Sequence, residues 1–128
     1  MKIKFILIFM VLLLIAGCAP AEKKIFQMEL DVARKSGLPV VVEIGADYCP
    51  PCRKLKPIIM ELSKEYQGKA IFLYLDVYKY RGVAKEFQTS VIPVIGFYDK
   101  KGKMAGRLVG FHDKQAIVNA LKEMKLIK

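Results

Sequence analysis

Two cysteines separated by two prolines form the most reactive motif of this chain. The residues are Cys49, Pro50, Pro51 and Cys52, and a pattern typical of a helix begins with them. Two thiols three positions apart can close a small disulfide or open to a dithiol. The N–H groups and dipole of a helix N-terminus favour the thiolate, which is the form that attacks disulfides. The spacing therefore indicates thiol–disulfide chemistry, although zinc sites use the same spacing.

The two cysteines are expected to differ in exposure and therefore in role. Cys49 precedes the helix and should be exposed, whereas Cys52 lies one turn inside it and should be more buried. We predict that Cys49 attacks a substrate disulfide and that Cys52 then attacks Cys49 and releases the reduced substrate. Because Pro50 and Pro51 lack N–H groups, the Cys52 N–H is the nearest remaining donor to the Cys49 sulfur. This predicts limited thiolate stabilisation and a weak oxidant.

The sequence predicts no metal site. Besides the two cysteines, the candidate metal ligand is His112, the only histidine. It is distant in the sequence and falls in a predicted loop after the last strand. A closed structural zinc site requires four ligands, and this set is too small. Transport of Cu(I) by the two thiolates is a further alternative, because thiolates suit soft ions.

Strands and helices alternate in the segments that must position the cysteines. A helical pattern begins at residue 24 and ends at Gly37 and Pro39, and the apolar run 40–44 reads as a strand buried on both faces. The later predicted elements are a helix over 50–66 that contains Pro57, a strand over 70–77, a short helix near 81–87, a strand over 91–98, a turn over 99–102, a strand over 104–109 and a last helix capped by Asp113. This order predicts an α/β fold: a mixed four-stranded sheet flanked by helices, with an extra N-terminal helix.

The N-terminal segment predicts export and a lipid anchor. Lys2 and Lys4 precede an apolar run over 5–15, which is too short to span a bilayer. The next residues end in Ala-Gly-Cys18 and resemble the bacterial lipobox, which is cut before a lipidated cysteine. We therefore expect a lipoprotein signal peptide over 1–17, a lipidated tether over 18–23 and one domain over 24–128. The alternatives are an ordinary secretory signal and an uncleaved anchor, and all three place the domain outside the cytoplasm, on the periplasmic side in a Gram-negative cell.

The chain is basic, with a formal net charge of +10. Basic surfaces attract nucleic acid, anionic lipid or acidic proteins. The lysines are dispersed, and no nucleic-acid-binding motif accompanies them. We therefore expect no nucleic-acid partner and interpret the charge as a solvated face near an anionic membrane.

The segment from Glu43 to Lys54, followed by Pro57, resembles the active-site segment of thioredoxins. Ile92-Pro93 resembles the cis-proline loop of that family, and Gly110 its glycine after the last strand. The resemblance extends over nearly all of 24–128 and implies the thioredoxin fold. It further implies a cis Ile92–Pro93 bond lying against the redox-active pair. The substrate-contacting residues that it implies are Tyr48, Pro50, Pro51 and Ile92.

The resemblance also assigns a role to Glu43. Thioredoxins carry a buried acid at this position, and a desolvated carboxylate there would have a raised pKa and could accept the Cys52 proton. The alternative is that Glu43 reaches solvent from the strand. Tyr74 stands where thioredoxins commonly have a lysine partner for the acid, which alters the local charge balance.

Together these features predict a monomeric, membrane-tethered, extracytoplasmic thiol–disulfide oxidoreductase without a cofactor. The double proline and Ile92 before the cis-proline look more like reducing thioredoxins than disulfide-forming oxidases. A reductase outside the cytoplasm needs electrons from across the membrane, so the resemblance implies a transmembrane thiol carrier of the DsbD or CcdA kind and oxidised proteins as substrates. A disulfide oxidase or isomerase and, less favoured, a Cu(I) metallochaperone are the alternative functions.

Overall fold

A computed structural model describes residues 29–128 of the chain. A helical segment over 29–34 precedes seven elements, which are β1 (Val40–Gly45), α3 (Pro50–Glu65), β2 (Ile71–Asp76), α4 (Val83–Glu86), β3 (Val94–Tyr98), β4 (Met104–Val109) and α5 (Lys114–Glu123). The predicted order of strands and helices is confirmed. The predicted signal peptide, Cys18 and the tether lie outside the described residues, as does the start of the predicted N-terminal helix.

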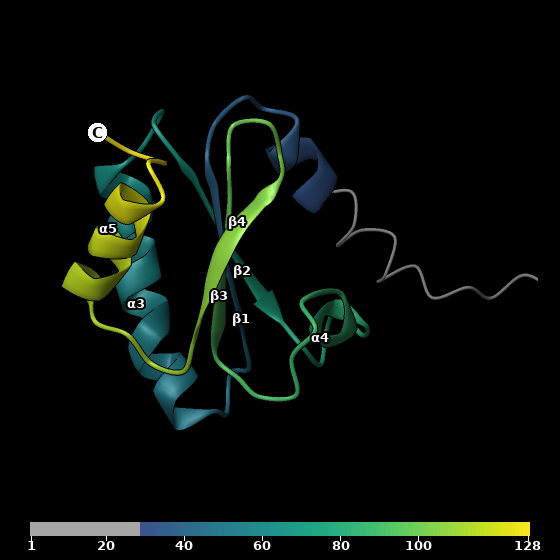
Figure 1. Ribbon diagram of the computed structural model, residues 1–128. Helices are drawn as coiled ribbons and strands as arrows, with labels where there is room; N and C mark the ends of the chain where they lie inside the picture. Colours follow the sequence, from purple (N-terminus) through teal and green to yellow (C-terminus); the bar gives the residue numbers. More distant parts are fainter. Residues whose placement is uncertain (1–28) are drawn as a thin grey trace, which may run out of the picture.

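The sheet has four strands in the order β2-β1-β3-β4. β1 and β2 are parallel, whereas β3 is antiparallel to both β1 and β4. Helices α3 and α5 cover one face, and α4 and the helical segment over 29–34 lie on the other (Figure 1). The predicted mixed sheet between two helical layers is confirmed. No helix within 29–128 combines the length and apolar character that a membrane span requires.

β1 lies at the centre of the sheet and is buried along its whole length. Side chains alternate along a strand, so its odd and even positions face different helical layers. Val41 packs into the apolar cluster beneath α3 and α5, while Val42 and Ile44 pack into the cluster on the opposite face. Glu43 and Gly45 therefore face the α3 side.

Two predicted boundaries differ from the structure. The strand expected over 91–98 begins only at Val94. The Thr89 hydroxyl donates to the Val91 carbonyl at 2.8 Å and accepts the Val91 N–H at 3.2 Å, so a local turn replaces the start of the strand. The short helix near 81–87 is confined to Val83–Glu86 and begins after Gly82 at φ 99°.

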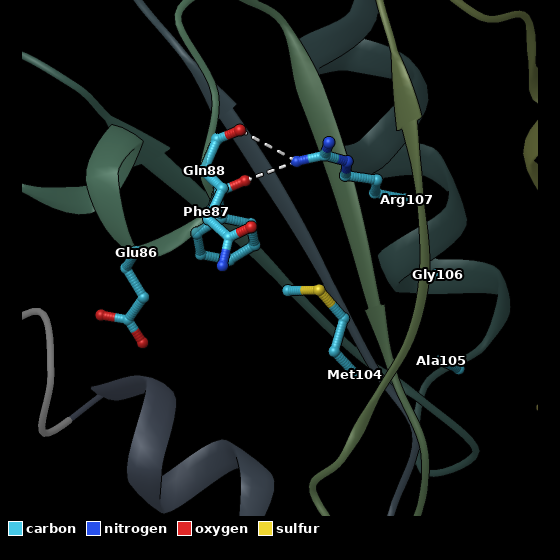
Figure 2. A pocket seen from close by; sticks show the side chains of 7 residues that line it. All are labelled: Glu86, Phe87, Gln88, Met104, Ala105, Gly106 and Arg107. Atoms are coloured by element: carbon cyan, nitrogen blue, oxygen red, sulfur yellow. Dashed lines mark hydrogen bonds between the residues drawn. The ribbon is translucent and has the colours of Figure 1, made fainter.

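Arg107 fastens the edge strand β4 to the end of α4. Its Nη1 donates to the carbonyl of Phe87 at 2.8 Å and to that of Gln88 at 3.1 Å (Figure 2). Phe87 is buried, and a Cβ at Gly96 would lie 2.5 Å from its ring, so this position of β3 needs glycine. These contacts fix the segment that leads from α4 to Pro93.

Candidate redox site

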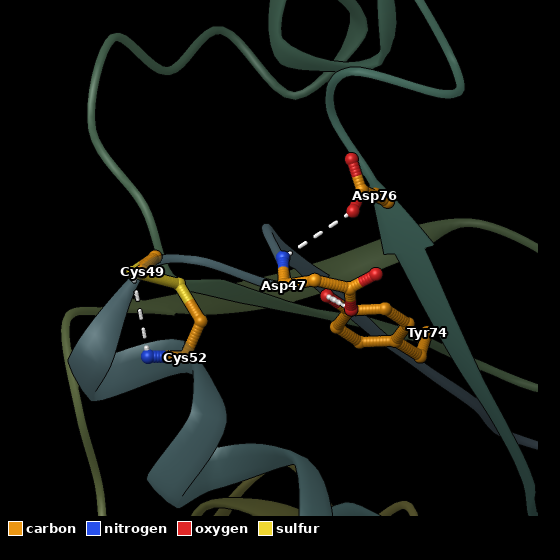
Figure 3. The surroundings of a disulfide bond; sticks show 5 residues. All are labelled: Asp47, Cys49, Cys52, Tyr74 and Asp76. Carbon is orange, nitrogen blue, oxygen red and sulfur yellow. Dashed lines mark hydrogen bonds between the residues drawn. A yellow bond between two sulfur atoms is a disulfide. The ribbon is translucent and has the colours of Figure 1, made fainter.

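Cys49 and Cys52 form a disulfide at the N-terminus of α3. Their Cα atoms are 5.2 Å apart, and Cys49 occupies the N-cap position (Figure 3). Cys52 is 1% exposed, whereas Cys49 is half-buried. The predicted asymmetry is confirmed, although Cys49 is less exposed than expected. The more accessible sulfur is the one that a second disulfide can approach.

One backbone donor reaches the Cys49 sulfur within the first turn of α3. The Cys52 N–H points at the Cys49 Sγ with an N···S distance of 3.4 Å. Pro50 and Pro51 occupy the first two helical positions and have no N–H to offer. The arrangement predicted from the double proline is therefore confirmed.

Glu43 is fully buried in the middle of β1. Neither carboxyl oxygen has a hydrogen-bond partner within residues 29–128. Burial raises the pKa of Glu43 from an ordinary value of 4.5 to about 8, and the nearby positive charge of Lys56 opposes part of this rise. The alternative prediction, in which Glu43 reaches solvent, is wrong. At neutral pH this side chain is mainly a neutral acid.

Glu43 and Cys52 lie on the same side of the sheet. Gly45 is two residues after Glu43 and faces the same way, and a Cβ at Gly45 would lie 3.1 Å from the Cys52 Cβ and 3.4 Å from its Sγ. The strand therefore passes directly beneath the buried cysteine. This geometry places the acid on the side of the sheet from which Cys52 would exchange a proton.

Lys56 of α3 places a positive charge near Glu43. It follows Cys52 by four residues and so shares its face of the helix. Its Nζ lies 4.1 Å from the centroid of the Tyr74 ring and 3.1 Å from Asp47 Oδ1. Tyr74 is the direct neighbour of Glu43 in β2. The cation that the resemblance placed on β2 is thus supplied by α3.

Asp47 and Asp76 hold the loop that carries the cysteines. Asp76 is buried, and its Oδ2 accepts the Asp47 N–H at 3.3 Å (Figure 3). The Asp47 carboxylate accepts hydrogen bonds from the Tyr74 hydroxyl at 3.3 Å and from Lys79 at 3.4 Å. Hydrogen bonding to Lys56, more than any other contact, lowers the pKa of Asp47. The ionised aspartate therefore keeps Lys56 above Tyr74.

The Ile92–Pro93 peptide bond is cis, as predicted. Val94 pairs with Ile44 across β1 and β3, so Pro93 lies next to the end of β1 from which the chain runs to Cys49. The Pro93 carbonyl accepts the Gly110 N–H at 2.8 Å. The two segments that the resemblance assigned to the site therefore meet at one edge of the sheet.

The other predicted contact residues surround this edge. Tyr48 is 66% exposed and packs against Tyr78, with ring centroids 4.8 Å apart and the rings tilted by 39°. Pro50 and Pro51 are exposed, and Ile92 is half-buried. His112 follows Gly110 by two residues, and its Nε2 contacts the Val109 carbonyl at 3.2 Å. Within 29–128 no group of three or more His, Cys, Asp or Glu residues is arranged to hold a metal ion.

Sequence reasoning missed three contributors to the site, which are Lys56, Asp47 and Tyr78. The spacing of Lys56 from Cys52 was a usable signal, because residues four apart share a helix face. Asp47 and Tyr78 gave no such signal, since their partners are distant in the sequence or are exposed aromatic rings.

Comparisons with known proteins agree with this geometry. Residues 19–123 match the family model described as Thioredoxin. The chain is 35% identical to Thioredoxin H4 of Arabidopsis thaliana over 96 residues, which are 75% of this chain and 78% of the relative. It is 36% identical to a thioredoxin of Pongo abelii over 102 residues, 78% of this chain and 93% of the relative. A thioredoxin of Staphylococcus aureus strain Mu50 is 31% identical over 98 residues, 77% of this chain and 92% of the relative.

Proposed function

The chain belongs to the thioredoxin family, and from this premise we propose that it is a membrane-tethered, extracytoplasmic reductase of protein disulfides. Thiol–disulfide oxidoreductase chemistry follows from the family and from the Cys49–Cys52 disulfide. The direction, the location and the residue roles are the proposal. The observation that carries the direction is the single N–H at 3.4 Å from the Cys49 sulfur.

The proposed cycle begins with the dithiol form. The Cys49 thiolate attacks one sulfur of a substrate disulfide, so a Cys49–substrate bond forms and the other substrate sulfur leaves as a thiolate. The minor fraction of Glu43 that is ionised at neutral pH accepts the Cys52 proton, and the Cys52 thiolate attacks the Cys49 sulfur. The second substrate sulfur leaves, two electrons have passed to the substrate, and the Cys49–Cys52 disulfide has formed.

A weakly stabilised Cys49 thiolate favours this direction. Disulfide-forming oxidases are strong oxidants because their reduced form is stabilised. Here the prolines remove two donors from the helix N-terminus, so the dithiol gains little from hydrogen bonding. We expect a reduction potential near the thioredoxin value of about −270 mV and far from the value of about −120 mV for an oxidase. A potential near the oxidase value would reverse the proposed direction.

Substrate contact is assigned to the edge around the disulfide. We assign substrate binding to Tyr48, Pro50 and Pro51, which adjoin Cys49 in the chain, and to Ile92, which precedes the cis proline. The variant Cys52→Ser should accumulate a mixed disulfide on Cys49, whereas the double variant Cys49→Ser with Cys52→Ser should accumulate none. Mass spectrometry of the trapped complexes would identify the substrates. Failure of the native chain to reduce insulin with any thiol donor would contradict the reductase proposal, and stoichiometric Cu(I) binding without exchange would favour the metallochaperone.

The tether and the electron donor complete the proposal. Signal peptidase cleavage before Cys18 would leave a lipid on this cysteine and hold the domain beside the bilayer. A transmembrane thiol carrier of the DsbD or CcdA kind would then return two electrons to the Cys49–Cys52 disulfide. Metabolic labelling with a tagged fatty acid should mark the native chain and leave Cys18→Ala unmarked. Equal labelling of the two chains would contradict lipidation at Cys18.

A further inference from the structure

A groove lined by lysines lies at the end of the domain far from the disulfide. Its volume is about 530 Å³. We call its four exposed lysines the basic pole: Lys69, Lys100, Lys125 and Lys128. The other lining residues are uncharged, namely Leu38, Tyr66, Gly68, Leu126 and Ile127.

The topology fixes the position of the basic pole relative to the redox site. Its residues come from the turn after α3, the turn between β3 and β4, and the segment after α5. The disulfide lies at the opposite end of α3, at its N-terminus. A helix of 16 residues is about 24 Å long, so the two features are separated by about the length of the domain (Figure 1).

Three carboxylates near the basic pole in the sequence are engaged elsewhere, and a fourth, the exposed Glu123, lies two residues before Lys125. Glu61 and Glu65 both pair with Lys114, at 2.8 and 2.7 Å. The Asp99 carboxylate accepts two backbone N–H groups of its own turn. Among the ion pairs that the structure gives within residues 29–128, none includes a lysine of the basic pole. Its positive charge is therefore available to an external anion.

We propose that the basic pole docks on an anionic lipid surface and holds the disulfide away from the bilayer. This inference rests on the membrane tethering proposed above, because a tether keeps the domain at a high local concentration beside lipid headgroups. Lysine is a compact point charge that suits a fluid layer of phosphates, which offers no fixed geometry. Each lysine near such a surface contributes about fivefold in affinity, and salt weakens the attraction.

Docking in this orientation has a consequence for the partners of the redox site. The sheet edge with Cys49 and Tyr48 would face outward, where soluble protein disulfides can approach it. The attraction is individually weak for each lysine and is reversible, so the domain can leave the surface and turn. A transmembrane electron donor would then be reached in the undocked state.

The test measures hydrogen exchange of the full chain on two kinds of vesicle. One kind contains phosphatidylcholine alone, and the other also contains phosphatidylglycerol. On the anionic vesicles we expect backbone amides near the basic pole, over 66–69, 99–103 and 124–128, to exchange at least about fivefold more slowly than on the neutral ones. High salt should abolish the difference, and the amides around Cys49 should not change.

A pair of charge-reversed variants supplies the control. Lys69→Glu with Lys125→Glu should remove the protection. Arg81→Glu with Lys85→Glu makes the same change of charge at exposed positions near the disulfide end, and it should leave the protection intact. Equal loss in both variants would show a response to net charge and would overturn the inference.

The remaining outcomes separate the inference from the proposed tether. Retention of the chain on neutral vesicles reports the tether alone, and its absence would contradict tethering. Retention on both vesicles without slower exchange at the basic pole would overturn docking and leave the tether standing. Equal protection by heparin or RNA in solution would assign the basic pole to soluble polyanions and overturn the lipid assignment.

Discussion

The two faces of the six-residue strand β1 differ in the side chains that they carry: one is wholly apolar, and the other includes a buried acid near the disulfide. On one face Val40, Val42 and Ile44 pack into an apolar cluster of aliphatic and aromatic side chains. On the other face Val41 belongs to the core beneath α3, but Glu43 and Gly45 follow it towards the disulfide. The first face contributes stability at every pH. The second face is less stabilising, because it buries the carboxyl group of Glu43 and has a glycine where the strand approaches Cys52.

The largest effect should come from opening the apolar face. Ile44→Ala removes a fully buried side chain and should lower the free energy of unfolding by about 4 kcal/mol. The loss should be the same at pH 5 and pH 9, because no charged group belongs to this cluster. Urea unfolding at the two pH values measures this loss of unfolding free energy. A loss that changed strongly with pH would contradict the proposed difference between the two faces of β1.

Glu43 should make the stability of the native chain depend on pH. Its pKa is raised by folding from 4.5 to about 8, so the folded state binds the proton more tightly. The stability linked to this proton is present below pH 4.5 and is lost as the pH rises through 8, and the loss reaches on the order of 3 kcal/mol at pH 7. Glu43→Gln should lack this loss and should be the more stable chain at pH 9.

Urea unfolding of the oxidised chains from pH 4 to pH 9 tests this prediction. Glu86→Gln at an exposed position of α4 is the matched control and should follow the native chain. A native chain that gained stability between pH 5 and pH 9 relative to Glu43→Gln would contradict the raised pKa.

Gly45 should be sensitive to a single methyl group. In Gly45→Ala the new Cβ would lie 3.1 Å from the Cys52 Cβ and 3.3 Å from the Tyr74 ring, so neighbours must move. We expect a loss of about 1–2 kcal/mol in unfolding free energy and slower reduction of the disulfide by dithiothreitol. Unchanged values for both would show that the strand and Cys52 are less closely packed than the structure indicates.

The smallest effect should come from removing the positive charge of Lys56, which acts on the pKa of Glu43. Lys56→Met removes the positive charge that lowers the pKa of Glu43, so this pKa should rise further. Lys56→Arg keeps the charge and should leave the pKa near that of the native chain. Carbon-13 NMR of the Glu43 carboxyl group measures the shift. A lower pKa in Lys56→Met would contradict the assigned interaction.

Most of the fold could be predicted because local patterns agree with it. The continuous apolar run of β1, the alternation of strands and helices, and the Asp113 cap each specify their element without distant contacts. The start of β3 could not be predicted, because the apolar residues Val91 and Ile92 read as strand while the Thr89 hydroxyl turns the chain. Local hydrogen bonding took precedence over the apolar pattern there.

The residues of the site divide in the same way. The Cys49–Cys52 pair, its single backbone donor and the cis Ile92–Pro93 bond were predicted from the motif and its resemblance. The surroundings of Glu43 were not, because Lys56 approaches it only through the packing of α3 on the sheet. The basic pole is a further case, since its lysines are dispersed in the sequence and gather only in space.

The sequence by itself determined the redox pair, because two cysteines at a helix start need only local geometry to form a disulfide. It also determined that an acid would stand in the central strand. Only the tertiary structure decided the burial and the pKa of that acid. Packing of α3 over β1 removes Glu43 from water and raises its pKa, and it supplies the charge of Lys56 from a different element than expected. Desolvation and through-space charge depend on which elements meet, and that is settled when the chain folds.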